Sequence, residues 1–192
     1  MRALHAFLAD QRGAAAGEFA LVLPLVLIFL LGIVDVGYYA WTINRGEKAT
    51  QIGARWAVAT DMVPADLKTY SFAISGGIQQ GTTVPEASLP PFTCTSTGCT
   101  QWGFDGAAFN AIRDRMQEFY PEIEDENIQL DYRWSGLGYA GDPNGPDVAP
   151  IVTVRLVNMQ HRPIFSLLLG TVDLPDFAYS LTTEDSDGSF SN

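Results

Sequence analysis

The chain has 192 residues and a formal net charge of −11, and both values limit what it can be. The length fits one modest domain with a terminal appendage. Residues 42–192 carry a net charge of −10. This argues against a nucleic-acid-binding surface, because phosphate binding depends on clustered lysine and arginine. It also argues against adsorption of this part on anionic lipid.

Apolar residues are concentrated near the N-terminus. Residues 20–34 read ALVLPLVLIFLLGIV, without one charged side chain, and the wider run Phe19–Trp41 is 23 residues long. About 20 apolar residues span the hydrocarbon core of a bilayer as a helix. We therefore predict a transmembrane helix that continues outward, over residues 14–60 in total.

The continuation beyond the bilayer also has a helical pattern. Large or apolar side chains recur there at three- and four-residue steps, which predicts that one face packs against the rest of the chain. The residues of this predicted stripe are Tyr38, Trp41, Arg45, Ala49, Ile52 and Trp56.

Two other interpretations of the apolar run are less favoured. A cleaved secretory signal needs small residues before its cleavage site, and Tyr38 stands where such a residue is expected if Ala40 ends the signal. A buried core helix would need an apolar surround on every side. The remainder of the chain is not apolar enough to provide it.

Two carboxylates do not fit a plain membrane anchor. Glu18 lies at the start of the apolar run and Asp35 lies within it. Ionised groups in such positions are costly, and they usually have a partner or face another helix. From its spacing alone, Glu18 is either such a partner or an interfacial residue whose carboxylate reaches water.

The residues around Glu18 form a specific pattern. Residues 12–19 read RGAAAGEF, in which a glycine is followed by four residues, a glutamate and an aromatic residue at the start of an apolar helix. This pattern resembles a prepilin peptidase site. Residues 12–60, including GEFALVLPLVLIFLLGIVDVGYYAW and GARWAVAT, are similar to the TadE-like family. That family comprises pilin-like proteins of the tight-adherence (type IVc) pilus, and residues beyond 60 look like the periplasmic part of its longer members.

The resemblance implies a processed subunit. Residues 1–13 would be a leader peptide, cut between Gly13 and Ala14. Glu18, Phe19 and Asp35 would take part in subunit assembly, with the Glu18 carboxylate neutralising the N-terminal amine of a neighbouring subunit. The attraction between such charges is strong in a low dielectric, although desolvation offsets much of it.

The resemblance also implies a location and a set of partners. The chain would be a single-pass protein of the bacterial inner membrane, with its N-terminus in the cytoplasm and its C-terminal part in the periplasm. Its partners would be other pilins and pseudopilins, the prepilin peptidase, the inner-membrane assembly platform and the lipid bilayer. No catalytic activity and no cofactor are implied.

Two cysteines, Cys94 and Cys99, lie in the sequence CTSTGC. In an oxidising compartment a local disulfide is favoured over free thiols. A zinc site is disfavoured, because zinc needs four ligands and no histidine lies nearby.

Residues 61–192 are predicted to form an α+β domain. A turn-rich segment over about 64–103 precedes a helix that Asp105 caps and Pro121 ends. Three segments alternate as strands and predict a roughly three-stranded antiparallel sheet, with the helix on its apolar face. The strand segments are Asn127–Trp134, Ile151–Val157 and Phe177–Thr183.

Candidate ligand and catalytic residues are few. Asp142, Asn144 and Asp147 are weak calcium candidates, because their spacing does not match an EF-hand, and such residues also make turns. His161 would be the sole histidine outside the predicted leader, and no nucleophile motif accompanies it. We therefore expect a minor pilin-like subunit. The alternatives are a pseudopilin of another type II-like secretion system and a membrane-anchored surface binding module.

Overall fold

The computed structural model describes residues 14–164 and 170–183. These residues fall into two compact units. The first contains described residues of Met1–Trp41 and Arg162–Val172, and the second contains those of Thr42–His161 and Asp173–Asn192. The predicted leader, residues 1–13, lies outside the described residues. Each unit is considered by itself below.

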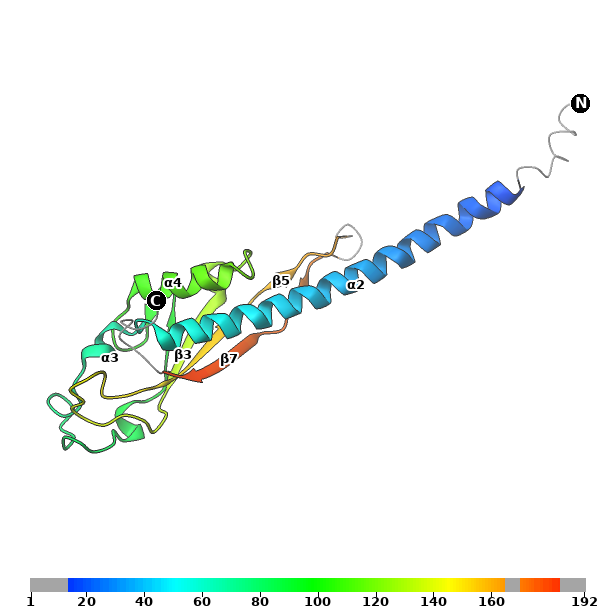
Figure 1. The fold of residues 1–192 in the computed structure, drawn as a ribbon. Helices are drawn as coiled ribbons and strands as arrows, with labels where there is room; N and C mark the ends of the chain where they lie inside the picture. Colours follow the sequence, from blue (N-terminus) through cyan, green and yellow to red (C-terminus); the bar gives the residue numbers. More distant parts are fainter. Residues whose placement is uncertain (1–13, 165–169, 184–192) are drawn as a thin grey trace, which may run out of the picture. The chain divides into compact units, whose positions relative to one another are not determined.

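The first element is the helix α2 (Ala14–Ala59), which runs for 46 residues without interruption (Figure 1). Its bounds agree with the predicted helix over 14–60. Pro24 lies inside the helix and does not end it. Proline is tolerated in the apolar helices of membrane proteins, where neighbouring groups satisfy the freed backbone carbonyl.

The part of α2 in the second unit packs through small side chains. Gly46 and Gly53 are buried, and a Cβ at Gly46 would lie 2.5 Å from the ring of Phe177. A Cβ at Gly53 would lie 2.7 Å from Met116. The buried residues recur at helical spacing, and they are Thr42, Gly46, Ala49, Thr50, Gly53, Ala54, Ala57 and Val58.

This buried stripe corrects the one predicted from large side chains. Of the predicted residues only Ala49 is fully buried, whereas Trp41 is exposed and Trp56 is half-buried. Side chains such as the Phe177 ring and Met116 pack so closely on the helix that only small residues fit at Gly46 and Gly53. The larger side chains therefore flank the contact, and Trp56 instead lies under the guanidinium of Arg115, 5.5 Å from its ring centroid.

The second unit is built on a five-stranded antiparallel sheet in the order β2-β1-β3-β4-β7. The strands are β1 (Phe92–Thr95), β2 (Gly98–Cys99), β3 (Ile128–Arg133), β4 (Ile151–Leu156) and β7 (Phe177–Thr182). The predicted α+β class and the three predicted strands are confirmed. The sheet is wider than predicted because the hairpin β1–β2 adds two strands from the turn-rich segment.

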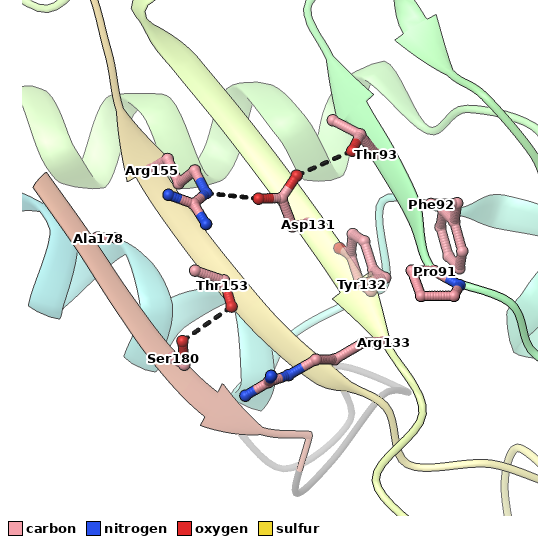
Figure 2. Close-up of a pocket in the computed structure, with 10 residues that line it drawn as sticks. All are labelled: Pro91, Phe92, Thr93, Asp131, Tyr132, Arg133, Thr153, Arg155, Ala178 and Ser180. Atoms are coloured by element: carbon pink, nitrogen blue, oxygen red, sulfur yellow. Dashed lines mark hydrogen bonds and ion pairs between the residues drawn. The ribbon is translucent and has the colours of Figure 1, made fainter. Parts of the chain in front are cut away.

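Alternation along the strands separates an apolar face from a polar face. In β3 the buried residues are Ile128, Leu130 and Tyr132, and in β4 they include Val154 and Leu156. The ring of Tyr132 stacks on the ring of Phe92 in the neighbouring strand β1, with centroids 5.0 Å apart. These side chains form the core under α2 and α4, and both helices lie behind the sheet in Figure 2.

The helix α4 (Gly106–Gln117) begins where the sequence predicts it. The Asp105 carboxylate accepts hydrogen bonds from the backbone N–H groups of Ala107 and Ala108, at 2.8 and 3.1 Å. Such a cap satisfies donors that the first turn of a helix leaves unpaired. The residues that α4 buries are Ala108, Phe109, Ile112 and Met116.

Several short elements were not predicted. The turn-rich segment contains α3 (Ala65–Thr69) and the 3₁₀ helix η2 (Glu86–Ser88), and η3 (Asp125–Asn127) precedes β3. A separate two-stranded sheet pairs β5 (Gln160–His161) with β6 (Val172–Asp173). Two-residue strands are too short to show a period of two in the sequence.

Candidate functional site

In the first unit, α2 exposes a continuous apolar surface. From Phe19 to Val36 the large apolar side chains face outward, and their exposed fractions range from 39% at Leu23 to 81% at Leu21. Leu31 is half-buried. These 18 residues extend about 27 Å as an α-helix, close to the thickness of a bilayer core. A helix that is apolar on every side needs lipid or other helices around it.

Glu18 is exposed and directly precedes this surface. It lies about 6 Å along the helix axis from Ala14, the first helical residue described. Gly13, the other half of the predicted processing site, lies outside the described residues. Phe19 follows with 64% of its surface exposed. Within the described structure, Glu18 and Phe19, two of the three predicted assembly residues, are thus exposed to another molecule.

Asp35 differs from Glu18, because its side chain is buried within the first unit. It is 7% exposed, and its Oδ1 accepts a hydrogen bond of 2.8 Å from the backbone N–H of Ile164. A hydrogen bond to a carboxylate compensates part of the cost of removing it from water. Asp35 therefore has a partner in its own chain, and its role between subunits stays a prediction.

Aromatic residues follow Asp35 at the end of the apolar surface. The rings of Tyr38 and Trp41 stack with centroids 5.7 Å apart, and Trp41 is 53% exposed. Tyrosine and tryptophan are enriched at membrane–water interfaces, since one end of each ring system is apolar and the other is polar. This placement agrees with a span that ends near Tyr38.

The predicted disulfide is present between Cys94 and Cys99. It connects the directly paired residues of β1 and β2, and Cys94 is fully buried. Gly98 has a φ of 134°, a conformation that favours glycine and lets the chain reverse between the two strands. The bond therefore closes a hairpin at one edge of the sheet.

The weak calcium candidates serve as turn formers. Asp147 is 4% exposed, and its two carboxylate oxygens accept hydrogen bonds from the backbone N–H groups of Phe72 and Asp142, at 2.6 and 2.9 Å. Asp142 in turn accepts one from the N–H of Asn144. Among residues 14–164 and 170–183, no group of three or more histidine, cysteine, aspartate or glutamate side chains could hold a metal ion.

The polar face of the sheet carries a shallow hollow of about 440 Å³ (Figure 2). At its centre the Asp131 carboxylate accepts hydrogen bonds from Thr93 and Gln129, both at 2.8 Å, and from Arg155 at 2.5 Å. Burial raises the pKa of Asp131, but the hydrogen bonds from Gln129, Arg155 and Thr93 outweigh it and hold the pKa below its ordinary 3.8.

The sequence analysis did not single out this cluster. Its only signal was the alternation of Gln129, Asp131 and Arg133 with the buried residues of β3. The polar atoms at the centre of the hollow bond to one another, and Thr153 shares a hydrogen bond of 2.8 Å with Ser180. The cluster therefore ties four strands together and does not indicate a class of ligand.

Comparison with protein families gives a match to the helix α2 and none to the sheet. Residues 13–55 match the family model described as TadE-like protein. The predicted resemblance is confirmed. This TadE-like segment contains Glu18, the exposed apolar surface and most of the packed part of α2, whereas every strand of the sheet lies beyond it. Neither the curated proteins nor the solved structures contain a match to the chain.

The TadE-like segment contains the whole exposed apolar surface of α2. The helix is long and apolar enough to cross a membrane once. The match covers this helix alone, and together with the helix it favours a membrane protein related to the tight-adherence pilus.

Proposed function

We propose that this chain is a membrane-anchored, minor pilin-like (pseudopilin) subunit that takes part in the assembly of a tight-adherence pilus. The observation that carries the proposal is the exposed apolar surface over Phe19–Val36, which begins directly after an exposed glutamate inside the TadE-like segment. Through the pilus, the protein would contribute to surface attachment and biofilm formation.

The membrane anchor has a physical basis, because exposing the apolar surface of α2 to water costs free energy. Burial of apolar area is favourable by roughly 25 cal/mol per Å², so a two-turn stretch of exposed leucine and isoleucine would already drive association. Phe19–Val36 extends over five turns with every large side chain outward or half-buried. The bilayer covers this surface before assembly, and the helices of other pilins replace part of the lipid afterwards.

Glu18 gives the assembled helices a fixed register. Its carboxylate lies at the edge of the apolar surface, where the N-terminal amine of a neighbouring processed subunit can approach it. A pair of opposite charges in this surrounding tolerates little displacement, because an unpaired charge in a low dielectric costs several kcal/mol. The proposed pair therefore favours one stagger between adjacent subunits.

The proposal includes an orientation. Residues 1–13 precede the span as a leader on the cytoplasmic side of the inner membrane, where a prepilin peptidase cuts the Gly13–Ala14 bond. The sheet domain lies in the periplasm, and the disulfide between Cys94 and Cys99 suits that oxidising compartment. The partners are other pilins and pseudopilins, the peptidase and the assembly platform of the inner membrane.

Deletion of the gene tests this function. Electron microscopy should show loss or shortening of surface filaments, and a surface-attachment assay should show fewer attached cells. A plasmid copy of the wild-type gene should restore both. Normal filaments and normal attachment in the deletion strain would contradict the proposal. Loss of a secreted protein with filaments intact would favour a pseudopilin of another type II-like secretion system.

A further inference from the structure

The segment Arg162–Val172 belongs to the same unit as the first part of α2, and Ile164 at one of its described ends contacts that helix. Asp35 accepts a hydrogen bond from the Ile164 N–H, so Ile164 stands at the level where the apolar surface of α2 ends. On either side of Asp35, Val34 and Val36 are 54% and 70% exposed. The two parts of the chain thus meet at the expected edge of the bilayer core.

Apolar side chains are exposed on this segment as well. Ile164 is 58% exposed and Val172 is 41% exposed. The one charged residue in the segment is Arg162, which is exposed. The sequence of residues 165–169 adds no charge.

We propose that Ile164 and Val172 form a second membrane contact, in which both side chains enter the interface of the outer leaflet beside α2. The lipid bilayer is the occupant at this apolar rim because Ile164 is bonded to α2 at Asp35, between Val34 and Val36 of the exposed apolar surface. Arg162 lies at the polar end of the same segment, where a cation meets lipid phosphate groups. The inference rests on the membrane anchoring in the proposed function.

The Asp35–Ile164 hydrogen bond gives this contact its depth. It links the carboxylate to a backbone amide, so it does not depend on the side chain at position 164. The bond places Ile164 at a fixed height on the helix and compensates the carboxylate at the boundary between lipid and water. Two points of contact would also restrict rotation of α2 about its own axis in the bilayer.

Fluorescent labels at single cysteines test the rim directly. The two native cysteines are joined, so an introduced cysteine can be labelled without reductant. Ile164→Cys and Val172→Cys place an environment-sensitive dye on the rim. Phe29→Cys places it on the middle of the exposed helix, and Ile74→Cys is the matched control, since Ile74 is an isoleucine with 88% exposure in the second unit.

The labelled full-length proteins are reconstituted into phosphatidylcholine vesicles with nitroxide groups placed either shallow or deep on the acyl chains. Dyes at 164 and 172 should lose emission with the shallow nitroxide, the dye at 29 with the deep one, and the dye at 74 only with iodide in the water. Phosphatidylcholine carries no net charge, so electrostatic adsorption does not contribute.

The other outcomes are distinguishable. If dyes at 164 and 172 are quenched by iodide and not by lipid nitroxides, the rim is in water and the inference is wrong, while quenching at 29 leaves the anchor intact. Protection at 164 and 172 from both quenchers indicates a protein occupant and also overturns the inference. Equal lipid quenching at 74 and 164 shows general adsorption and not a specific rim. Absence of lipid quenching at 29 refutes the anchor itself.

Discussion

The two halves of α2 belong to one uninterrupted helix, but the first half is largely exposed and the second half is packed against the sheet domain. Residues 19–36 expose leucine, isoleucine, valine and phenylalanine side chains, whereas residues 42–59 bury glycine, alanine and threonine against the sheet. Small residues lie where other side chains pack directly on the helix, as the Phe177 ring does at Gly46. Most of the large residues of 19–36 are exposed within the described chain. The size of the side chains therefore separates the half that folds the domain from the half that we propose contacts other molecules.

The largest expected effect is on assembly through Glu18. Replacing it with alanine leaves a neighbouring amine unpaired, a cost of roughly 3–5 kcal/mol for a buried charge. Glu18→Ala should lose crosslinking to other pilins and surface piliation, whereas the unfolding of the sheet domain should not change. Glu18→Asp should be intermediate, because it keeps the charge and shortens the reach.

Glu47→Ala is the matched control for this prediction. Glu47 is an exposed carboxylate on the same helix, but it lies in the half that folds the domain. The variant should assemble like the wild type at equal amounts of processed protein. Normal crosslinking of processed Glu18→Ala would contradict the pairing role and leave Glu18 as an interfacial residue.

The second-largest expected effect is a loss of folding stability when Gly46 is replaced. A Cβ there would lie 2.5–2.8 Å from three atoms of the Phe177 ring, so Gly46→Leu should force the helix away from the sheet. We expect a loss of about 3 kcal/mol in the free energy of unfolding, measured by denaturant titration in detergent micelles. Gly32→Leu should cause no loss, because a Cβ at Gly32 meets nothing within 4 Å. Equal losses in both variants would remove the distinction between the two halves.

The third effect concerns the edge of the sheet. Replacing Cys94 and Cys99 with serine should lower the free energy of unfolding by on the order of 2 kcal/mol, since the disulfide closes a short loop. Membrane insertion through the exposed half of α2 should be unaffected. Alkylation of the exported wild-type protein without reductant should label neither cysteine, and full labelling of both would refute the bond in the cell.

The smallest effect is the pH dependence of the Asp131 cluster. Because hydrogen bonds hold the Asp131 pKa below its ordinary 3.8, its carboxylate stabilises the sheet fully above that value. The contribution is lost as the pH falls through the lower pKa of the folded state. Asp131→Asn should cost at most about 1 kcal/mol at neutral pH, since Arg155 is partly exposed. The difference from the wild type should disappear in acid, and a difference that grows in acid would contradict this account.

The sequence predicts the parts of this molecule whose patterns are long. Many apolar residues specify α2, the alternation in β3 and β4 spans six residues each, and Asp105 is a recognisable helix cap. The hairpin β1–β2 was missed, because its strands are short and adjoin two prolines that resemble a loop. The packed stripe of α2 was assigned to large side chains, since the closeness of helix and sheet depends on tertiary packing.

The candidate site shows a similar division. Glu18 and the disulfide are local features, visible in a few consecutive residues. The hydrogen bond from Ile164 to Asp35 joins residues 129 positions apart, and no local pattern reveals such a pair. The Asp131 cluster likewise draws Thr93 and Arg155 from different strands. Contacts of this kind follow from the tertiary arrangement of the elements, which the sequence alone left open.

The most direct test of the central claim is the mass of the mature N-terminus in the native host. If the exposed half of α2 is a pilin-like assembly segment, a prepilin peptidase cuts the Gly13–Ala14 bond, and the purified membrane protein begins at Ala14. Mass spectrometry of the N-terminal peptide should find that start, with or without a methyl group on the amine. A protein that retains Met1, or one that begins at Trp41 after removal of a secretory signal, would contradict the account.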